Sequence, residues 1–146
     1  MRVVERVAVG TDGSETASRA VEFAIDMAQR YGSKLLVISS YSPVPEDRLR
    51  KEQRDAPQEL VWSINPMEDV EATLRDVEEK ARERGVDTFS EARQGDPADV
   101  LCAVADEQGA DLLIVGSKGM DRRVRGSVPN TVSHKAPCSV LIVKTD

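Results

Sequence analysis

Short runs of apolar residues alternate along the chain with longer segments in which apolar residues recur at helical spacing. The runs at 35–38 and 112–115 are continuous, which is typical of parallel strands covered on both faces. A first strand is expected within residues 3–9, a weaker one at 88–93 and a last one at 139–144. Helical spacing is found at 15–31, from Pro66 to Gly85, from 97 to 109 and at about 127–135.

This order of strands and helices predicts an α/β fold, with a five-stranded parallel sheet that is doubly wound and carries helices on both faces. Residues 41–65 interrupt the pattern with prolines and charges, and Trp62 is their only large anchor. We interpret this stretch as a long surface connection and not as a linker between domains. The chain is therefore expected to form one domain over residues 1–146.

Composition and charge narrow the range of partners. The 146 residues are 40% hydrophobic and 32% charged, enough for one core with a charged surface. The net charge of -6 argues against broad binding of nucleic acid or of an anionic membrane. No apolar run approaches the ~20 residues that cross a bilayer. Charges interrupt the first apolar residues, so no signal peptide is expected there. We expect a cytoplasmic protein with no nucleic-acid or membrane partner.

Two glycine-containing segments follow predicted strands. The sequence GTDGS at 10–14 follows the first strand, and GSKG at 116–119 follows the fourth. Ligands of open α/β sheets bind at the carboxyl ends of the strands, where the strand order reverses. If the first and fourth strands are neighbours, both segments border one crevice, and their backbone N–H groups suit phosphate. An ordinary turn explains either segment alone better than a ligand does, but their pairing favours a site.

The same segments resemble those of the universal stress protein family. Residues 7–14 are similar to its opening strand and loop, 115–119 with 126–130 to its phosphate-binding segment, and 136–143 to its closing strand. The resemblance covers the chain from end to end and implies the adenine nucleotide α-hydrolase-like fold. It implies ATP, AMP or cyclic AMP as bound ligand, with magnesium on the phosphates as an option. It further implies a homodimer through the C-terminal strand 139–144.

The resemblance also assigns roles to residues. Asp12 would meet the ribose or a metal ion on the phosphates, and the backbone around Ser39 and Ser40 would meet adenine. The nucleotide-binding residues expected in this way are Thr11, Asp12, Ser40, Val115, Gly116, Ser117, Gly119, Arg125, Gly126, Ser127 and Val128. Other interpretations stay open, because Asp12 also fits an Asx turn or a helix cap, and Ser14 and Ser127 fit helix caps.

One departure from the family pattern concerns the phosphate segment. In nucleotide-binding members nine residues separate Gly-x-x-Gly from the following Gly-Ser or Gly-Thr, whereas six separate Gly119 from Gly126. Three of the six are Arg122, Arg123 and Arg125. They either clamp phosphates or form a solvated basic turn, and the sequence favours neither.

Motifs for catalysis are lacking in the sequence. It holds no P-loop motif and no serine in a nucleophile elbow, and its single histidine, His134, is expected on the exposed side of the last helix. Cys102 is expected in the core and Cys138 at a strand start. The leading hypothesis is an adenine-nucleotide-binding stress-response or signalling domain with at most very slow ATP hydrolysis. The alternative is a dimeric interaction module of the same fold that binds no nucleotide, and an ATP-using enzyme is least favoured.

Overall fold

The computed structural model describes residues 4–41, 66–117 and 127–145, in which strands and helices alternate strictly. The strands are β1 (Arg6–Gly10), β2 (Lys34–Tyr41), β3 (Thr88–Gln94), β4 (Leu112–Gly116) and β5 (Ser139–Val143). The helices are α1 (Glu15–Tyr31), α4 (Pro66–Glu83), α5 (Pro97–Glu107) and α6 (Ser127–Lys135).

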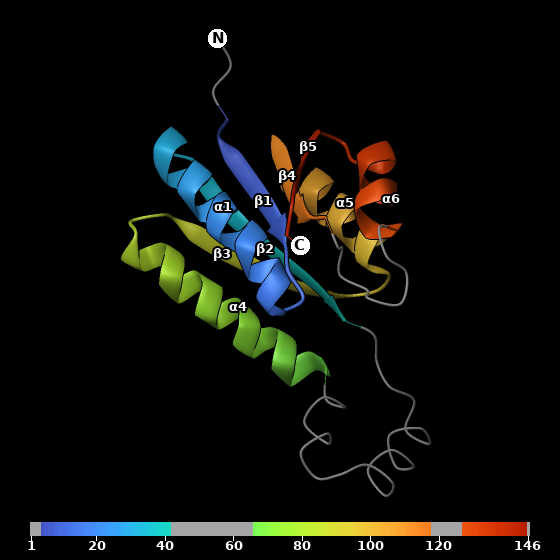
Figure 1. Ribbon diagram of the computed structural model, residues 1–146, viewed down its shortest axis with the longest axis horizontal. Helices are drawn as coiled ribbons and strands as arrows, with labels where there is room; N and C mark the ends of the chain where they lie inside the picture. Colours follow the sequence, from blue (N-terminus) through green and yellow to red (C-terminus); the bar gives the residue numbers. More distant parts are fainter. Residues whose placement is uncertain (1–3, 42–65, 118–126, 146) are drawn as a thin grey trace, which may run out of the picture.

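The five strands form one parallel sheet in the order β3-β2-β1-β4-β5 (Figure 1). The chain builds the sheet outward from β1 through β2 to β3, then returns to the other side of β1 with β4 and continues to β5. The order therefore reverses between β1 and β4. The predicted α/β class is confirmed, and the condition that the first and fourth strands are neighbours is met.

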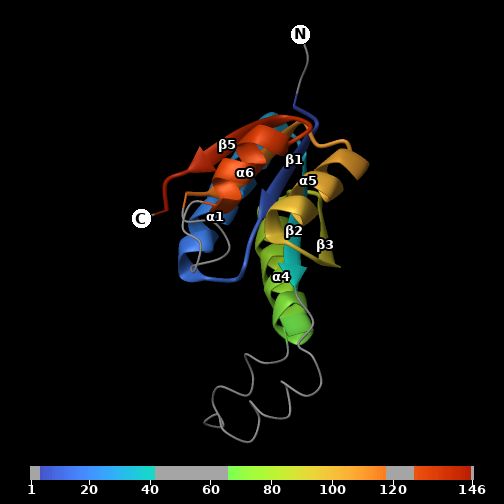
Figure 2. The same ribbon diagram turned by 90° about the vertical axis from the view of Figure 1, so that its right-hand side faces the viewer.

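Helices cover the two faces of the sheet separately, as the edge-on view in Figure 2 shows. Val7 and Val9 of β1 pack with α1 and α4 in one apolar cluster, whereas Ala8 between them packs with α5 and α6 in a second cluster. Successive side chains of a strand point to opposite faces, so the continuous apolar runs serve both clusters. The sheet is doubly wound, as predicted.

Local signals in the sequence set the helix ends. Ser14 caps α1 by accepting a hydrogen bond from the amide of Ala17, and Gly32 ends it in the left-handed conformation with φ 67°. Asp96 caps α5 in the same way, and Pro97 follows in its first turn. The helix-cap interpretation of Ser14 is confirmed.

Several strand boundaries differ from the predicted ones, most of them by a single residue. β1 begins at Arg6, after Val4, and β5 ends at Val143. β2 continues beyond its apolar run at 35–38, through two serines, to Tyr41, which the sequence pattern places in the irregular connection. Pairing of β2 with β3 extends to the pair Tyr41 and Gln94, so backbone hydrogen bonds carry the strand beyond its apolar run. The remainder of the expected connection, residues 42–65, lies outside the described residues.

Candidate functional site

The carboxyl ends of β1 and β4 lie side by side at the point where the strand order reverses. Val9 pairs with Ile114, and shortly after this pair β1 ends at Gly10 and β4 ends at Gly116. The two segments singled out in the sequence therefore begin together at one edge of the sheet. This is the position at which open α/β sheets bind ligands.

Thr11 is held rigidly at the start of the first segment. It is buried, its amide donates to the carbonyl oxygen of Ile38 at 3.0 Å, and its hydroxyl accepts from the amide of Gly13 at 3.1 Å. Gly13 has φ 81°, a conformation that glycine adopts without strain. The chain thus turns sharply after β1 and passes directly into α1.

Asp12 stands exposed on this turn. Its Oδ1 accepts a hydrogen bond from the amide of Ser14 at 2.9 Å, which is an Asx turn, while Ser14 itself caps α1. Of the open interpretations, the turn therefore falls to Asp12 and the cap to Ser14. The Asx turn fixes the direction of a carboxylate that remains accessible at the edge of the site.

The end of β2 adds Ser39 and Ser40. The Ser39 hydroxyl is buried and donates to the carbonyl oxygen of Thr11 at 2.7 Å, whereas Ser40 is half-buried and pairs with Arg93 of β3. Ser39 therefore ties β2 to the first segment, and its neighbour continues the same edge. The expected contribution of β2 thus lies beside Thr11.

The end of β4 consists of Val115, Gly116 and Ser117. Val115 is buried in the core, and the amide of Ser117 donates to the carbonyl oxygen of Val143 at 2.8 Å. The Ser117 hydroxyl accepts from the amide of Thr145 at 3.1 Å. The amide of Ser117 is therefore engaged with the end of β5, and its hydroxyl with Thr145 beyond that strand.

The remaining expected residues are placed only in part. Gly119, Arg125 and Gly126 lie outside the described residues, and Ser127 is described only as the first residue of α6. Val128 is 4% exposed and packs in the cluster beneath α5 and α6. Its side chain is therefore a core group, and only its backbone can face a ligand.

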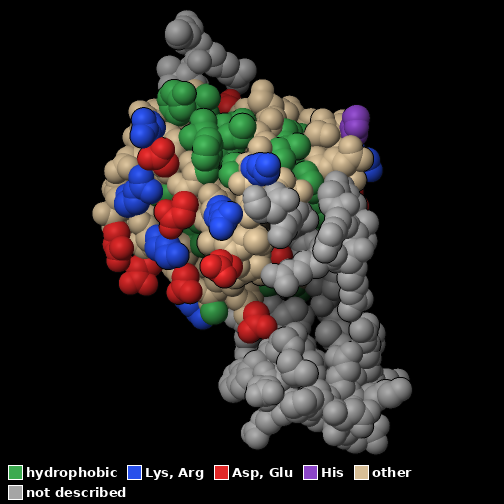
Figure 3. All heavy atoms as spheres, viewed as in Figure 1, with side chains coloured by type: hydrophobic (Ala, Val, Ile, Leu, Met, Phe, Trp, Pro, Cys, Tyr) green, Lys and Arg blue, Asp and Glu red, His purple; other side chains and the backbone are tan. Residues whose placement is uncertain are grey.

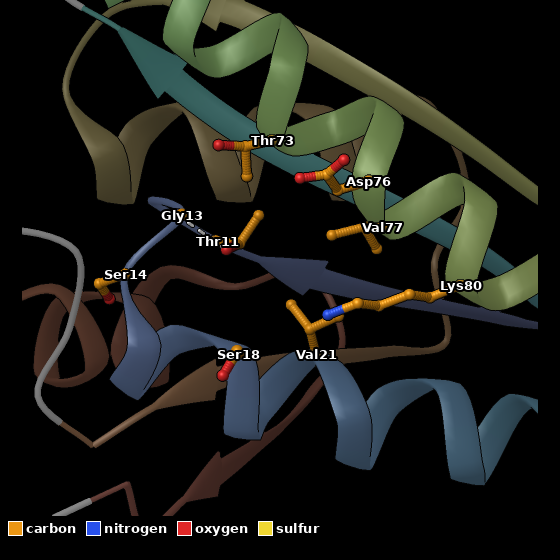
Figure 4. A pocket seen from close by; sticks show the side chains of 9 residues that line it. All are labelled: Thr11, Gly13, Ser14, Ser18, Val21, Thr73, Asp76, Val77 and Lys80. Atoms are coloured by element: carbon orange, nitrogen blue, oxygen red, sulfur yellow. Dashed lines mark hydrogen bonds between the residues drawn. The ribbon is translucent and has the colours of Figure 1, made fainter. Parts of the chain in front are cut away.

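A small cavity of about 110 Å³ lies between α1 and α4, next to the first segment (Figure 4). It is lined by Thr11, Gly13, Ser14, Ser18, Val21, Thr73, Asp76, Val77 and Lys80. Ligand pockets usually measure about 300–1,000 Å³, so this space is too small for a nucleotide. Three of its hydroxyls, those of Thr11, Ser14 and Ser18, are already bonded to nearby backbone.

Two residues bonded near the site were not found from the sequence. Thr145 is 1% exposed, and its carbonyl oxygen accepts a hydrogen bond from Arg19 of α1 at 3.1 Å. Arg19 has the spacing of the solvated face of α1, and Thr145 comes after the last apolar run, so neither position carried a signal. Only the return of the chain over β4 brings them together.

The two cysteines do not provide an activated nucleophile. Burial raises the pKa of both thiols, and the neighbouring Asp99 adds to this for Cys102. A raised pKa keeps a thiol protonated and unreactive. His134 is exposed on α6, as expected.

Metal and membrane sites were also considered. Within residues 4–41, 66–117 and 127–145 no three histidine, cysteine or acidic side chains come together as a metal-binding group. In the same ranges no helix has the length and apolarity to cross a membrane.

Comparison with known families gives a direct result. The family model described as the universal stress protein family matches residues 4–144. The chain belongs to the universal stress protein family. A universal stress protein of Mycobacterium tuberculosis is 36% identical, over 99% of both chains. Another, from Methanocaldococcus jannaschii, is 31% identical over 96% of this chain and 82% of its own length.

A solved structure extends this likeness to three dimensions. The crystal structure of a universal stress protein in complex with cyclic AMP has a TM-score of 0.73 and is 32% identical, covering 99% of this chain and 100% of that one. The resemblance seen at residues 7–14, 115–119, 126–130 and 136–143 is thereby confirmed at the level of family and fold.

Proposed function

We propose that this chain binds an adenine nucleotide at the carboxyl ends of β1 and β4 and acts in a stress response or in signalling. ATP, AMP and cyclic AMP are the candidate ligands. The observation that carries the proposal is the parallel pairing of β1 with β4, which brings the ends of both strands together at the reversal point of the sheet. The relative solved with cyclic AMP supports it, because that protein shares the fold and about a third of the sequence.

Within the proposed site the nucleotide lies across both segments. Asp12 meets the ribose, and the end of β2 at Ser40 meets adenine through its backbone. The phosphates lie toward α6, since backbone N–H groups at a helix start attract anions. The residues proposed for this end are Val115, Gly116, Ser117, Gly119, Arg125, Gly126, Ser127 and Val128.

The proposed role is binding without efficient turnover. The described part of the site offers Asp12 as its carboxylate and neutral hydroxyls from Thr11 and Ser39, both already hydrogen-bonded. Such a set holds the nucleotide in its ground state but adds little that is specific to a transition state, and uniform binding does not accelerate chemistry. ATP hydrolysis is accordingly expected to be very slow and unaffected by replacing Asp12.

The test separates the charge of Asp12 from its role in the turn. In Asp12→Asn the amide oxygen can still accept from Ser14, so the loop keeps its shape while the charge is lost. We expect cyclic AMP and AMP to bind about tenfold more weakly, the size of one charge-assisted hydrogen bond. Asp106→Asn, on the exposed face of α5, is the control. Calorimetry that detects no nucleotide binding by the parent protein would favour the alternative of a dimeric interaction module.

We further propose a homodimer through β5. Both β3 and β5 are edges of the sheet, but they differ in chemistry. β3 carries Glu91 and Arg93, which pair with each other, and such charges discourage strand addition. β5 is the apolar sequence SVLIV, in which Ile142 is 46% exposed. Hydrophobic side chains also gather over the end of α1 and the β4–β5 side of the molecule (Figure 3).

The dimer is tested by its mass and by one substitution. Light scattering should give twice the chain mass of 16.0 kDa at micromolar concentration. Ile142→Arg should give the monomer, because it places a charge in the paired edge. Phe23→Arg is the control, since Phe23 is 43% exposed on α1 but belongs to no strand edge. A monomeric parent protein would contradict the proposal.

A further inference from the structure

Thr145 joins three parts of the fold two residues beyond β5. Its amide donates to the Ser117 hydroxyl at 3.1 Å, and its carbonyl oxygen accepts from Nη1 of Arg19 at 3.1 Å. Thr145 is almost completely buried although it is polar. Figures 1 and 2 show that the chain after β5 turns toward the side of the sheet that carries α1.

Packing between Thr145 and Gly116 constrains the same end of β4. A Cβ added to Gly116 would lie 3.0 Å from Cγ2 of Thr145, which is closer than ordinary side-chain contact. The glycine at the end of β4 therefore leaves room for the Thr145 methyl group. Thr145 thus holds both residues: its methyl group packs close to Gly116, and its amide donates a hydrogen bond to the Ser117 hydroxyl.

These interactions lie beyond the sheet itself. The pairing of β4 with β5 ends at Gly116 and Val143, so the strands are complete before Thr145 is reached. Thr145 adds a further anchor for Gly116, the last residue of β4, and for Ser117, the residue that follows it. Arg19, an exposed residue of α1, in turn fixes Thr145 with a charged donor.

We propose that Arg19 and Thr145 are positioning residues for the phosphate end of the nucleotide site. They hold the backbone of Gly116 and Ser117 in place and need not touch the nucleotide. The inference rests on the proposed function, which puts the phosphates at this end. It also changes the role expected of Ser117. Because its amide bonds Val143 and its hydroxyl bonds Thr145, Ser117 orients the backbone at the end of β4.

The experiment compares a ligand with a phosphate to one without. Arg19→Gln removes the charged donor and keeps a polar side chain of moderate length, and calorimetry measures adenosine and AMP binding. AMP affinity should fall about fivefold to tenfold, the size of one charge-assisted hydrogen bond, while adenosine affinity stays within about twofold. Arg19→Lys should recover part of the loss. Arg30→Gln is the control, because Arg30 pairs only with Asp26 on the same helix among the described residues.

A second measurement keeps the two proposals apart. Amide hydrogen exchange of the unliganded protein should be faster at residues 116 and 117 in Arg19→Gln and unchanged elsewhere on β4. If the parent protein binds no nucleotide, the proposed function fails, and faster local exchange would still show the anchoring. Equal losses of adenosine and AMP together with a lowered Tm, or unchanged AMP binding and unchanged exchange, would overturn the inference.

Discussion

Ser39 donates a hydrogen bond from its hydroxyl to the main-chain oxygen of Thr11 at 2.7 Å, and both residues are at most 2% exposed. The amide of Thr11 is bonded to β2 as well, through the carbonyl oxygen of Ile38. Thr11 is therefore bonded to β2 through both its backbone amide and its backbone carbonyl group. Asp12, with its exposed carboxylate, therefore comes directly after a residue that is fixed to the sheet.

Replacing Ser39 with alanine should destabilise the fold by about 1–3 kcal/mol, because the buried carbonyl oxygen of Thr11 loses its partner. Urea unfolding measures the free energy. Ser133→Ala is the matched control, since its hydroxyl also donates to a carbonyl oxygen at 2.7 Å but at the surface. The control should change stability by less than about 0.5 kcal/mol. Similar losses in both variants would contradict the importance of burial at Ser39.

Gly13→Ala should be destabilising for two separable reasons. The φ of 81° costs a residue with a Cβ about 1–2 kcal/mol. The new Cβ would also lie 2.6 Å from Oγ1 of Thr73 on α4, which requires one of the two elements to shift. Thr73→Ala in the same chain should recover the second part of the loss and leave the first. Thermal unfolding of the two single variants and the double variant measures this.

The control for that cycle is Gly32→Ala. Gly32 has a similar φ of 67°, but a Cβ added there has no neighbour within 4 Å. It should therefore show only the backbone cost of about 1–2 kcal/mol, with no recovery by Thr73→Ala. A Gly13 variant no less stable than the Gly32 variant would mean that the contact with α4 is readily relieved.

AMP or cyclic AMP should bind at least as well as ATP. Six residues separate Gly119 from Gly126, where the resemblance to the family pattern implies nine, so we expect less chain to be available around the distal phosphates. Exposed arginine pairs contribute only about 0–1 kcal/mol each and should not reverse this. Calorimetry at physiological salt compares the three ligands. A tenfold preference for ATP that disappears when Arg122, Arg123 and Arg125 become alanine would show that charge outweighs length.

Stability should decline at alkaline pH because of the two thiols. Burial raises the pKa of Cys102 and Cys138 above the ordinary value of 9.0, so the folded state retains their protons longer than the unfolded state does. The resulting stabilisation is complete below that value and is lost as the pH rises through the folded-state pKa. Urea unfolding between pH 7 and pH 10 should show a steeper decline for the parent protein than for a Cys102→Ala, Cys138→Ala variant. Parallel curves would contradict the assignment.

The sequence predicted the architecture because apolar runs and caps are local signals. The buried run at 35–38, the cap at Ser14 and the cap with proline at 96–97 each determine structure within a few residues. The extension of β2 to Tyr41 could not be predicted in this way, because pairing with β3 and not the strand's own residues carries it.

The candidate site could be predicted only where a segment carried its own signal. The Asp12 segment was found because glycine and Asx-turn residues follow a buried strand. The hydrogen bonds of Thr145 with Arg19 and Ser117 connect residues 126 and 28 positions apart. No local pattern marks such contacts, and they become visible only after the chain has folded back on itself.

The order of the strands has a consequence for the growing chain on the ribosome. The cluster beneath α1 and α4 draws most of its buried side chains from residues 7–86, so that side of the sheet can assemble early. Among the described residues, the opposite cluster has Ala8, Leu36 and Ile38 from the first half, and its other buried members come from position 98 onward. Until α5, β4 and α6 emerge, the chain lacks most of the residues that bury these three side chains in the folded protein, so this side of the sheet is completed last.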